Sequence, residues 1–178
     1  PHIVRVQAVP DVEKKSVDVH VWLRHAGAAA AARLQVFVRE ARGGKIAGGA
    51  ACDIAAGDEK GQVTIPLADA RLWSPEDPFL YDIEVRGEND VLRTRFGLRS
   101  FRFDPSTGRA ILNGKTYFLR GTNVTLYRFF EDAERKDRPW REDWVRRLHK
   151  AYRGMDWNML RYCIGFPPES WYRSADEE

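Results

Sequence analysis

The chain has 178 residues, of which 43% are hydrophobic and 31% are charged, a composition typical of a folded globular protein and not of a disordered one. This length is enough for one domain and part of another, since domains commonly have about 100 to 150 residues. The net charge of +3 comes from 29 basic and 26 acidic residues spread along the sequence, so we expect no nucleic-acid partner. No apolar run approaches the roughly 20 residues that a helix needs to span a bilayer.

The two cysteines, Cys52 and Cys163, lie in segments of different character. We interpret them as two buried thiols and not as a disulfide, and a metal site would need more ligands at closer spacing. We therefore expect neither a metal nor a cofactor. A start at Pro1, without Met, suggests a piece of a longer or processed chain.

Residues 1–104 contain a series of short segments with the period of β-strands. "SVDVHVWLR" places alternate apolar residues on one face, and "RLQVFVRE" repeats the pattern. Further strands are predicted in "GQVTIPL", "FLYDIEV" and "VLRTRFGLRSFRF", whereas the alanine-rich "HAGAAAAAR" is predicted to be a loop. Six or seven strands at a spacing of about ten residues predict an antiparallel β-sandwich of immunoglobulin type. The Cys, Trp, Cys pattern of a true antibody domain is absent.

A hairpin signal follows in "ILNGKTYF", residues 111–118, where Asn113 and Gly114 stand between β-forming residues. Both residues accept the positive φ of a type I′ turn, so this segment predicts a β-hairpin. The next residues, "LRGTN", end an apolar strand in polar side chains, as a strand does when it delivers side chains to a site.

The character of the sequence changes after Asp104. "RPWREDWVRRLHKAYRGM" has apolar residues at helical spacing and predicts a helix over 139–153, with Pro139 in its first turn and Gly154 just after its end. We interpret His149 on this helix as a surface residue. A strand over 157–163, "WNMLRYC", and a helix opening at Pro167 follow. The order strand, helix, strand, helix predicts parallel βα units, too few to close a sheet.

Four motifs in series resemble the middle of a glycoside hydrolase family 2 enzyme: "LWSPEDPFLYDIEV", "FGLRSFRFD", "ILNGKTYFLRGTN" and "WNMLRYC". That family includes β-galactosidases, β-glucuronidases and β-mannosidases. The resemblance implies an immunoglobulin-like sandwich over residues 1–104, followed over 105–178 by a hairpin and the first two βα units of a truncated (β/α)8 barrel. It implies a glycosidase that cleaves a β-linked sugar with retention of configuration.

The same resemblance implies positions for site residues. Phe118 to Asn123 would be the first barrel strand and residues 157–163 the second, and catalytic groups of such barrels lie at the C-terminal ends of the strands. Asn123 and Arg161 would then bind substrate. Two other interpretations stay open: Asn123 capping the following loop, and Arg161 pairing with a carboxylate in the barrel wall.

The resemblance implies no catalytic residue in this chain. A retaining glycosidase uses two carboxyl groups about 5 to 5.5 Å apart. In the family both are glutamates from later barrel strands, and no acidic residue of this sequence matches either motif. We therefore expect residues 1–178 alone to be inactive.

The loop after the first barrel strand carries aromatic and acidic residues. Tyr127, Phe129 and Phe130 would stack on a sugar or pack within the loop, and loop packing is the stronger interpretation. We expect the acidic residues of the same loop to be solvated: Glu131, Asp132, Glu134 and Asp137.

Two departures from the family pattern weaken the case for β-galactoside and β-glucuronide substrates. Thr125 stands where many β-galactosidases and β-glucuronidases have His, and Ile164 stands where galactosidases have His.

The alternative function is a non-catalytic immunoglobulin-like module that binds carbohydrate or protein, which explains residues 1–104 equally well. From the resemblance we expect a carbohydrate substrate. We expect a periplasmic or extracellular location, and a cytoplasmic location stays open. The exposed strand edges of the incomplete barrel make a homo-oligomer one expected outcome.

Overall fold

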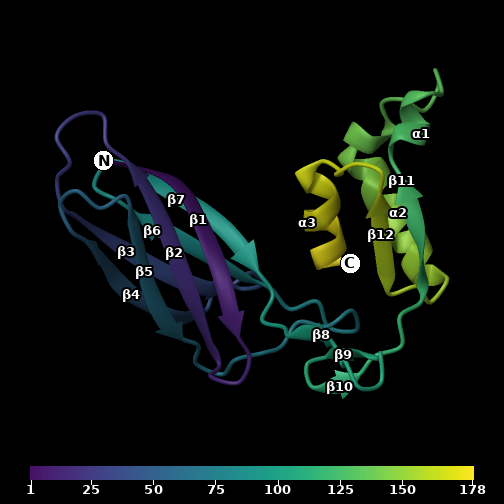
Figure 1. The fold of residues 1–178 in the computed structure, drawn as a ribbon, viewed down its shortest axis with the longest axis horizontal. Helices are drawn as coiled ribbons and strands as arrows, with labels where there is room; N and C mark the ends of the chain where they lie inside the picture. The colour runs from purple at the N-terminus through teal and green to yellow at the C-terminus, as the bar shows by residue number, and fades with distance from the viewer. The chain divides into compact units, whose positions relative to one another are not determined.

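The computed structural model describes all residues from 1 to 178 (Figure 1). The chain forms two compact units. The first comprises residues 1–101 together with 112–114, and the second comprises residues 102–111 and 115–178. None of the helices is long and apolar enough to cross a membrane.

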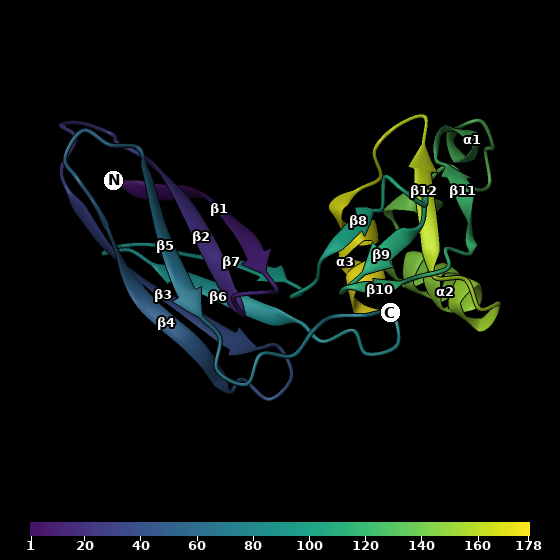
Figure 2. The ribbon, with the colours of Figure 1, turned by 60° about the horizontal axis from the view of Figure 1, so that its bottom comes forward.

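The first unit contains seven strands in two antiparallel sheets, which both views of the ribbon show (Figures 1 and 2). One sheet, here called the β2 sheet, has the order β1-β2-β5, formed by β1 (His2–Asp11), β2 (Ser16–Arg24) and β5 (Lys60–Pro66). The other, here called the β3 sheet, has the order β4-β3-β6-β7, formed by β4 (Ile46–Ile54), β3 (Ala32–Glu40), β6 (Tyr81–Arg86) and β7 (Val91–Phe96). The prediction of an antiparallel, mainly β fold is confirmed. In the constant-type immunoglobulin order the fourth strand joins the sheet of the first two, whereas here β4 pairs with β3.

The core of the first unit is built by the alternation that the sequence predicts. Val17, Val19 and Val21 of β2 are fully buried, as are Val36 and Val38 of β3. Side chains from both sheets belong to one apolar cluster. Burial of each such side chain stabilises the fold by about 1.5 to 3 kcal/mol. The segment from His25 to Ala31 between β2 and β3 is a loop, as predicted.

A small sheet of order β10-β9-β8 contains the predicted hairpin. It is formed by β8 (Phe101–Phe103), β9 (Ala110–Leu112) and β10 (Lys115–Thr116), so the single strand expected over 91–103 is in fact β7 and β8. Asn113 (φ 50°) and Gly114 (φ 79°) both have positive φ, which confirms the type I′ turn. Asn113 also donates from Nδ2 to the carbonyl oxygen of Trp73 at 2.9 Å and accepts at Oδ1 from the Ser100 amide at 3.0 Å.

The second unit has the predicted order of strand, helix, strand, helix. Its elements are β11 (Gly121–Thr125), α1 (Tyr127–Phe130), the 3₁₀ turn η1 (Arg138–Trp140), α2 (Glu142–Gly154), β12 (Met159–Cys163) and α3 (Glu169–Glu177). β11 and β12 are parallel, as predicted.

The helix expected over 139–153 begins later, at Glu142. Pro139 lies in the separate turn η1, and Arg141 between them is extended (φ −89°, ψ 103°). At the other end, Gly154 is the last helical residue, and Asp156 instead takes the left-handed conformation, with φ 59°.

Aromatic side chains form the core of the second unit. Val124, Leu126, Val145 and Trp171 are buried in one cluster, with Trp144, Leu148, Tyr152, Leu160 and Tyr162 packed against it. Trp171 has no exposed surface, and its Nε1 donates to the carbonyl oxygen of Pro139 at 2.8 Å. Thus α2 and α3 cover the face of the β11–β12 pair that carries Val124 and Tyr162.

Candidate functional site

The candidate site lies on the β11–β12 pair, and its first strand starts three residues later than expected. Residues 118–120 are not strand. Asn158 holds them instead: its Oδ1 accepts from the Arg120 amide at 2.8 Å, and its Nδ2 donates to the Phe118 carbonyl at 3.0 Å. The prediction of a strand over Phe118 to Asn123 was wrong at both ends, because β11 runs from Gly121 to Thr125 and Asn123 is its middle residue, not its last. Asn158 was not predicted as a site residue, because its partners lie 38 and 40 residues away in the sequence and no local pattern reveals them.

Gly121 allows β11 to approach β12 closely. A Cβ built on Gly121 would overlap the carbonyl oxygen of Met159 and lie 2.7 Å from its carbonyl carbon. Only glycine fits at this position, which is a physical reason for the glycine in the "RGTN" segment.

Asn123 and Arg161 lie directly opposite each other in the parallel register. Arg161 donates from Nη1 to Oδ1 of Asn123 over 3.5 Å, a long hydrogen bond, and both residues are exposed. Thr125 and Cys163 form the next pair, with Oγ1 and Sγ 3.0 Å apart. The structure therefore brings together the two residues that the sequence analysis assigned to the site.

These polar pairs lie on the face of the two strands that the helices do not cover. Side chains alternate along a strand, and the intervening Val124 and Tyr162 belong to the apolar cluster under α2 and α3. The contact with Asn123 uses one N–H group of Arg161, so the other N–H groups of Arg161 can still donate to a ligand. The Nδ2 group of Asn123 can also donate, because only its Oδ1 takes part in the contact. Such a surface can donate several hydrogen bonds to hydroxyl or carboxylate oxygens.

The aromatic residues after β11 divide into packed and exposed ones. Phe129 meets Trp144 edge to face at 5.3 Å, which supports the interpretation of loop packing for this residue. Phe130 stacks on Trp140 at 6.4 Å, with 50% and 65% of their surfaces exposed. Trp140, which lies within the helix predicted over 139–153, is therefore a surface residue of η1.

Three of the four acidic residues of the same loop, Glu131, Asp132 and Asp137, bind neighbouring arginines, as expected of solvated side chains. Asp132 pairs with Arg135, and Asp137 pairs with Arg141 at 2.5 Å. Hydrogen bonds from Arg135 hold the pKa of Asp132 below its usual range. No group of three or more His, Cys, Asp and Glu side chains is arranged to hold a metal ion. Both cysteines are free, as expected, but only Cys52 is buried, whereas Cys163 is half-buried.

The loop after β12 has an unusual backbone. Ile164 has φ 55°, in the left-handed region that a β-branched side chain rarely adopts. Ile164 is 71% exposed and Phe166 is 93% exposed. This loop follows directly on the strand that carries Arg161.

His149 is buried, so its prediction as a surface histidine was wrong. Only 5% of its surface is exposed, and it packs against the Trp171 ring at 5.6 Å. Its Nδ1 lies 2.9 Å from Oγ of Ser174, and its Nε2 lies 3.5 Å from the Tyr162 hydroxyl. Burial, with a smaller contribution from the Arg146 charge, lowers the pKa of His149 to about 4, so the ring is neutral near pH 7.

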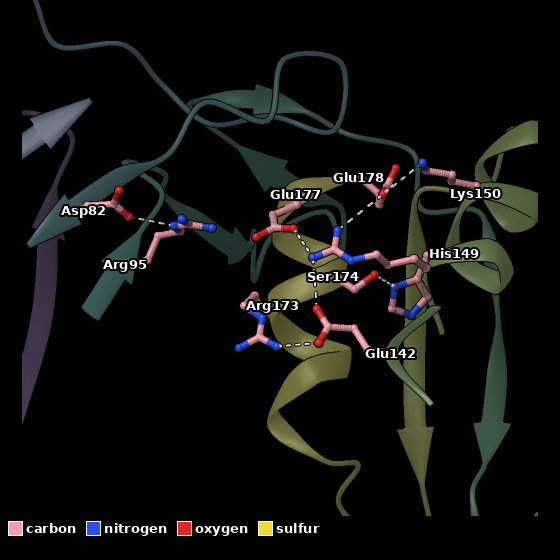
Figure 3. A network of polar contacts seen from close by, with 10 residues as sticks. Asp82, Arg95, Glu142, His149, Lys150, Arg173, Ser174, Glu177 and Glu178 are labelled. Atoms are coloured by element: carbon pink, nitrogen blue, oxygen red, sulfur yellow. Dashed lines mark hydrogen bonds and ion pairs between the residues drawn. The ribbon is translucent and has the colours of Figure 1, made fainter. Parts of the chain in front are cut away.

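Ion pairs join α2 to α3 next to this histidine (Figure 3). Glu142 of α2 binds Arg146 at 3.2 Å and Arg173 of α3 at 3.0 Å. Arg146 also binds Glu177 at 2.6 Å. Hydrogen bonds from Arg146 and Arg173 lower the pKa of Glu142. This network belongs to the packing of the two helices and not to the polar face of β11 and β12.

The sandwich of the first unit and the parallel strands of the second define a multidomain protein with an all-β domain before an α/β unit. Residues 1–99 match the sequence profile described as glycosyl hydrolases family 2, and the chain belongs to this family. No curated protein sequence gives a significant match.

Several solved structures have the same fold. A glycosyl hydrolase family 2 member from Bacteroides cellulosilyticus DSM 14838 superposes with a TM-score of 0.76 over 97% of this chain and 24% of that one, at 19% identity. The β-glucuronidase of Faecalibacterium prausnitzii gives 0.76 over 98% and 26%, at 24% identity. β-Glucuronidase 3 of Bacteroides uniformis gives 0.72 over 99% and 22%, at 25% identity. The chain thus spans about a quarter of the length of these proteins.

Proposed function

We propose that this chain is part of a retaining β-glycosidase, in which β11 and β12 are the first two strands of a (β/α)8 barrel. The pairing of Asn123 with Arg161 on the uncovered face of two parallel strands carries the proposal. Active sites of such barrels lie at the C-terminal ends of the strands, and Asn123 and Arg161 each lie two residues before the end of their strand. Membership of glycosyl hydrolases family 2 supports the reaction class.

In this proposal Asn123 and Arg161 position the sugar, and the two catalytic carboxylates come from polypeptide outside residues 1–178. The catalytic steps need one carboxyl group as nucleophile and one as acid and base. The polar face described above supplies donors and no such pair. The substrate is a β-linked sugar of an oligosaccharide, a polysaccharide or a glycoconjugate.

The first experiment uses residues 1–178 as they are. We expect no hydrolysis of aryl β-glycosides above the buffer rate, because the double displacement requires both carboxylates. Turnover that is lost on mutation of an acidic residue within 1–178 would contradict this assignment.

The second experiment uses the intact enzyme. Arg161→Ala should lower kcat/KM roughly thirtyfold or more, since it removes a charged hydrogen-bonding group beside the sugar. This decrease corresponds to a loss of about 2 kcal/mol of transition-state stabilisation. Arg147→Ala is a matched control, because Arg147 is exposed on α2 and pairs with Asp143 at 2.7 Å. Both variants should fold, and equal kcat/KM values for the two would exclude a role of Arg161 in the site.

A further inference from the structure

The outer face of the β2 sheet carries an ordered array of side chains that the proposed glycosidase site does not use. The strand register aligns three rows across β1, β2 and β5: Arg5, Trp22 and Lys60; Gln7, His20 and Gln62; Val9, Asp18 and Thr64. The residues between them on β2, such as Val19 and Val21, are fully buried. The three rows therefore lie on the face opposite the core.

Trp22 lies between two cations at the centre of the first row. The Arg5 guanidinium carbon is 4.6 Å from the centre of the Trp22 ring, and the Lys60 ammonium nitrogen is 5.1 Å from it. Arg24 adds a third cation to this face, because Leu23 between it and Trp22 points into the core. Cation–π attraction to one ring holds like charges close together.

None of these three cations has a carboxylate partner. Arg5 donates to the Gln7 amide oxygen at 3.2 Å, and neither it nor Arg24 nor Lys60 forms an ion pair. Glu59, next to Lys60, makes no ion pair either. Two carboxylates on the same face lie farther along the strands: Asp18 accepts a hydrogen bond from Thr64 and lies four residues from Trp22, about 13 Å along the strand, and Asp11 pairs with Lys14 at 3.1 Å.

In the other sheet several arginines are neutralised by carboxylates, although Arg39 and Arg86 there also lie over one ring, with guanidinium carbons 5.8 and 5.3 Å from the centre of Phe37. Arg86 and Arg93 of the β3 sheet both bind Glu84, and Arg95 binds Asp82 at 2.8 Å, which Figure 3 also shows. Residues 1–101 contain 14 basic and 14 acidic residues, so the surplus of positive charge around Trp22 is local. An anion bound there would meet donors that no protein carboxylate occupies.

We propose that this face, centred on Trp22, binds an acidic oligosaccharide whose carboxylates pair with Arg5 and Lys60. Arg5 and Lys60 lie two strands apart, about 10 Å between their backbones, a span that a disaccharide can bridge. The half-exposed indole supplies an apolar contact for the C–H groups of a sugar ring. Gln7 and Gln62 in the next row offer both donors and acceptors to sugar hydroxyls. The proposal does not depend on the function of Asn123 and Arg161.

Titration calorimetry of residues 1–178 with oligogalacturonate at low ionic strength tests the proposal. We expect oligogalacturonate to bind and neutral cello-oligosaccharides not to bind. Arg5→Gln, Lys60→Gln and Trp22→Ala should each raise Kd by about tenfold, as expected for loss of one charge-assisted or stacking contact. Arg93→Gln removes the same charge from the other sheet, where Arg86 still neutralises Glu84, and should leave Kd unchanged.

Three results would overturn the proposal. The first is no binding of oligogalacturonate. The second is an equal loss of affinity in Arg93→Gln, which would mean attraction to charge anywhere on the surface. The third is inorganic polyphosphate binding as tightly as oligogalacturonate without any dependence on Trp22, which would define a general polyanion surface. If Trp22→Ala lowers the thermal unfolding midpoint, its loss of affinity cannot be separated from a loss of folded protein. The binding affinities of Arg5→Gln and Lys60→Gln, which change exposed residues, then decide whether the proposal holds.

Discussion

The backbone at Gly121 passes so close to the carbonyl of Met159 that a methyl group on Gly121 would overlap it. Gly121→Ala should therefore force β11 and β12 apart and lower the free energy of unfolding of the second unit by about 2 kcal/mol or more. Gly154→Ala is the control, since nothing lies within 4 Å of its added Cβ and alanine favours the helix. Hydrogen exchange of the β12 amides measures the effect, and equal protection in both variants would contradict it.

Replacement of Trp171 should show how the second unit depends on its aromatic core. Trp171→Phe removes the buried hydrogen bond to the Pro139 carbonyl and some buried ring surface, so we expect a loss of about 2 kcal/mol or more. Trp140→Phe, at a site that is 65% exposed, should change stability by about 0.5 kcal/mol at most. Urea unfolding of the two variants makes the comparison, and similar midpoints would refute this description of the core.

Acid should destabilise the second unit through His149. The pKa of the folded-state ring is about 4, below the unfolded value of 6.5, so the unfolded state binds the proton first. Stability should fall as the pH drops from about 6.5 to about 4, by about 3 kcal/mol, and this contribution should then level off. The carboxylates of α2 with lowered pKa, Glu142 and Asp143, lose their contribution at lower pH, below their usual pKa values.

His149→Gln should flatten the pH dependence of stability between pH 4 and 6.5. His2→Gln, at an exposed terminal residue, should leave that dependence as in the unmodified protein. Urea unfolding at a series of pH values tests this, and a slope that persists in His149→Gln would assign it to another group.

Ile164 stores backbone strain that a different residue should relieve. Asn tolerates the left-handed region better than a β-branched side chain, so Ile164→Asn should raise stability by about 1 kcal/mol. Ile46→Asn is matched in chemistry and exposure, but Ile46 lies in β4 without positive φ, and its replacement should lower stability. Thermal denaturation compares the two, and a gain in both variants would point to a general effect of removing surface Ile.

Strands with clean alternation were predictable from the sequence, and β2 and β3 are examples. Neither β1 nor β4 was predicted. Gly48 and Gly49 interrupt β4, and glycine carries no side chain to show which face is buried. A shift of register between Ile3 and Arg5 breaks the period of β1. Such strands are fixed by pairing with neighbours, which a local pattern does not contain.

The candidate site was predictable in part, and for different reasons. Family resemblance selected Asn123 and Arg161, but their alignment depends on the parallel register of strands 38 residues apart. His149 was misjudged because its helix is rich in basic residues. What buries it, Ser174 and Trp171, comes from α3, which only the tertiary fold brings against α2.

The turn at Asn113 has a consequence for the integrity of the first unit. Residues 112–114 belong to that unit, although the chain on both sides of them belongs to the second. Protease cleavage in the exposed turn between Asp104 and Gly108 would therefore yield two pieces that both contribute to the sandwich unit. The Asn113 side chain, bound to the backbone of Trp73 and Ser100, would still fasten the downstream piece to the upstream one. The nicked protein would elute as a single species until a denaturant separated it, as in a split protein that reassembles from its halves.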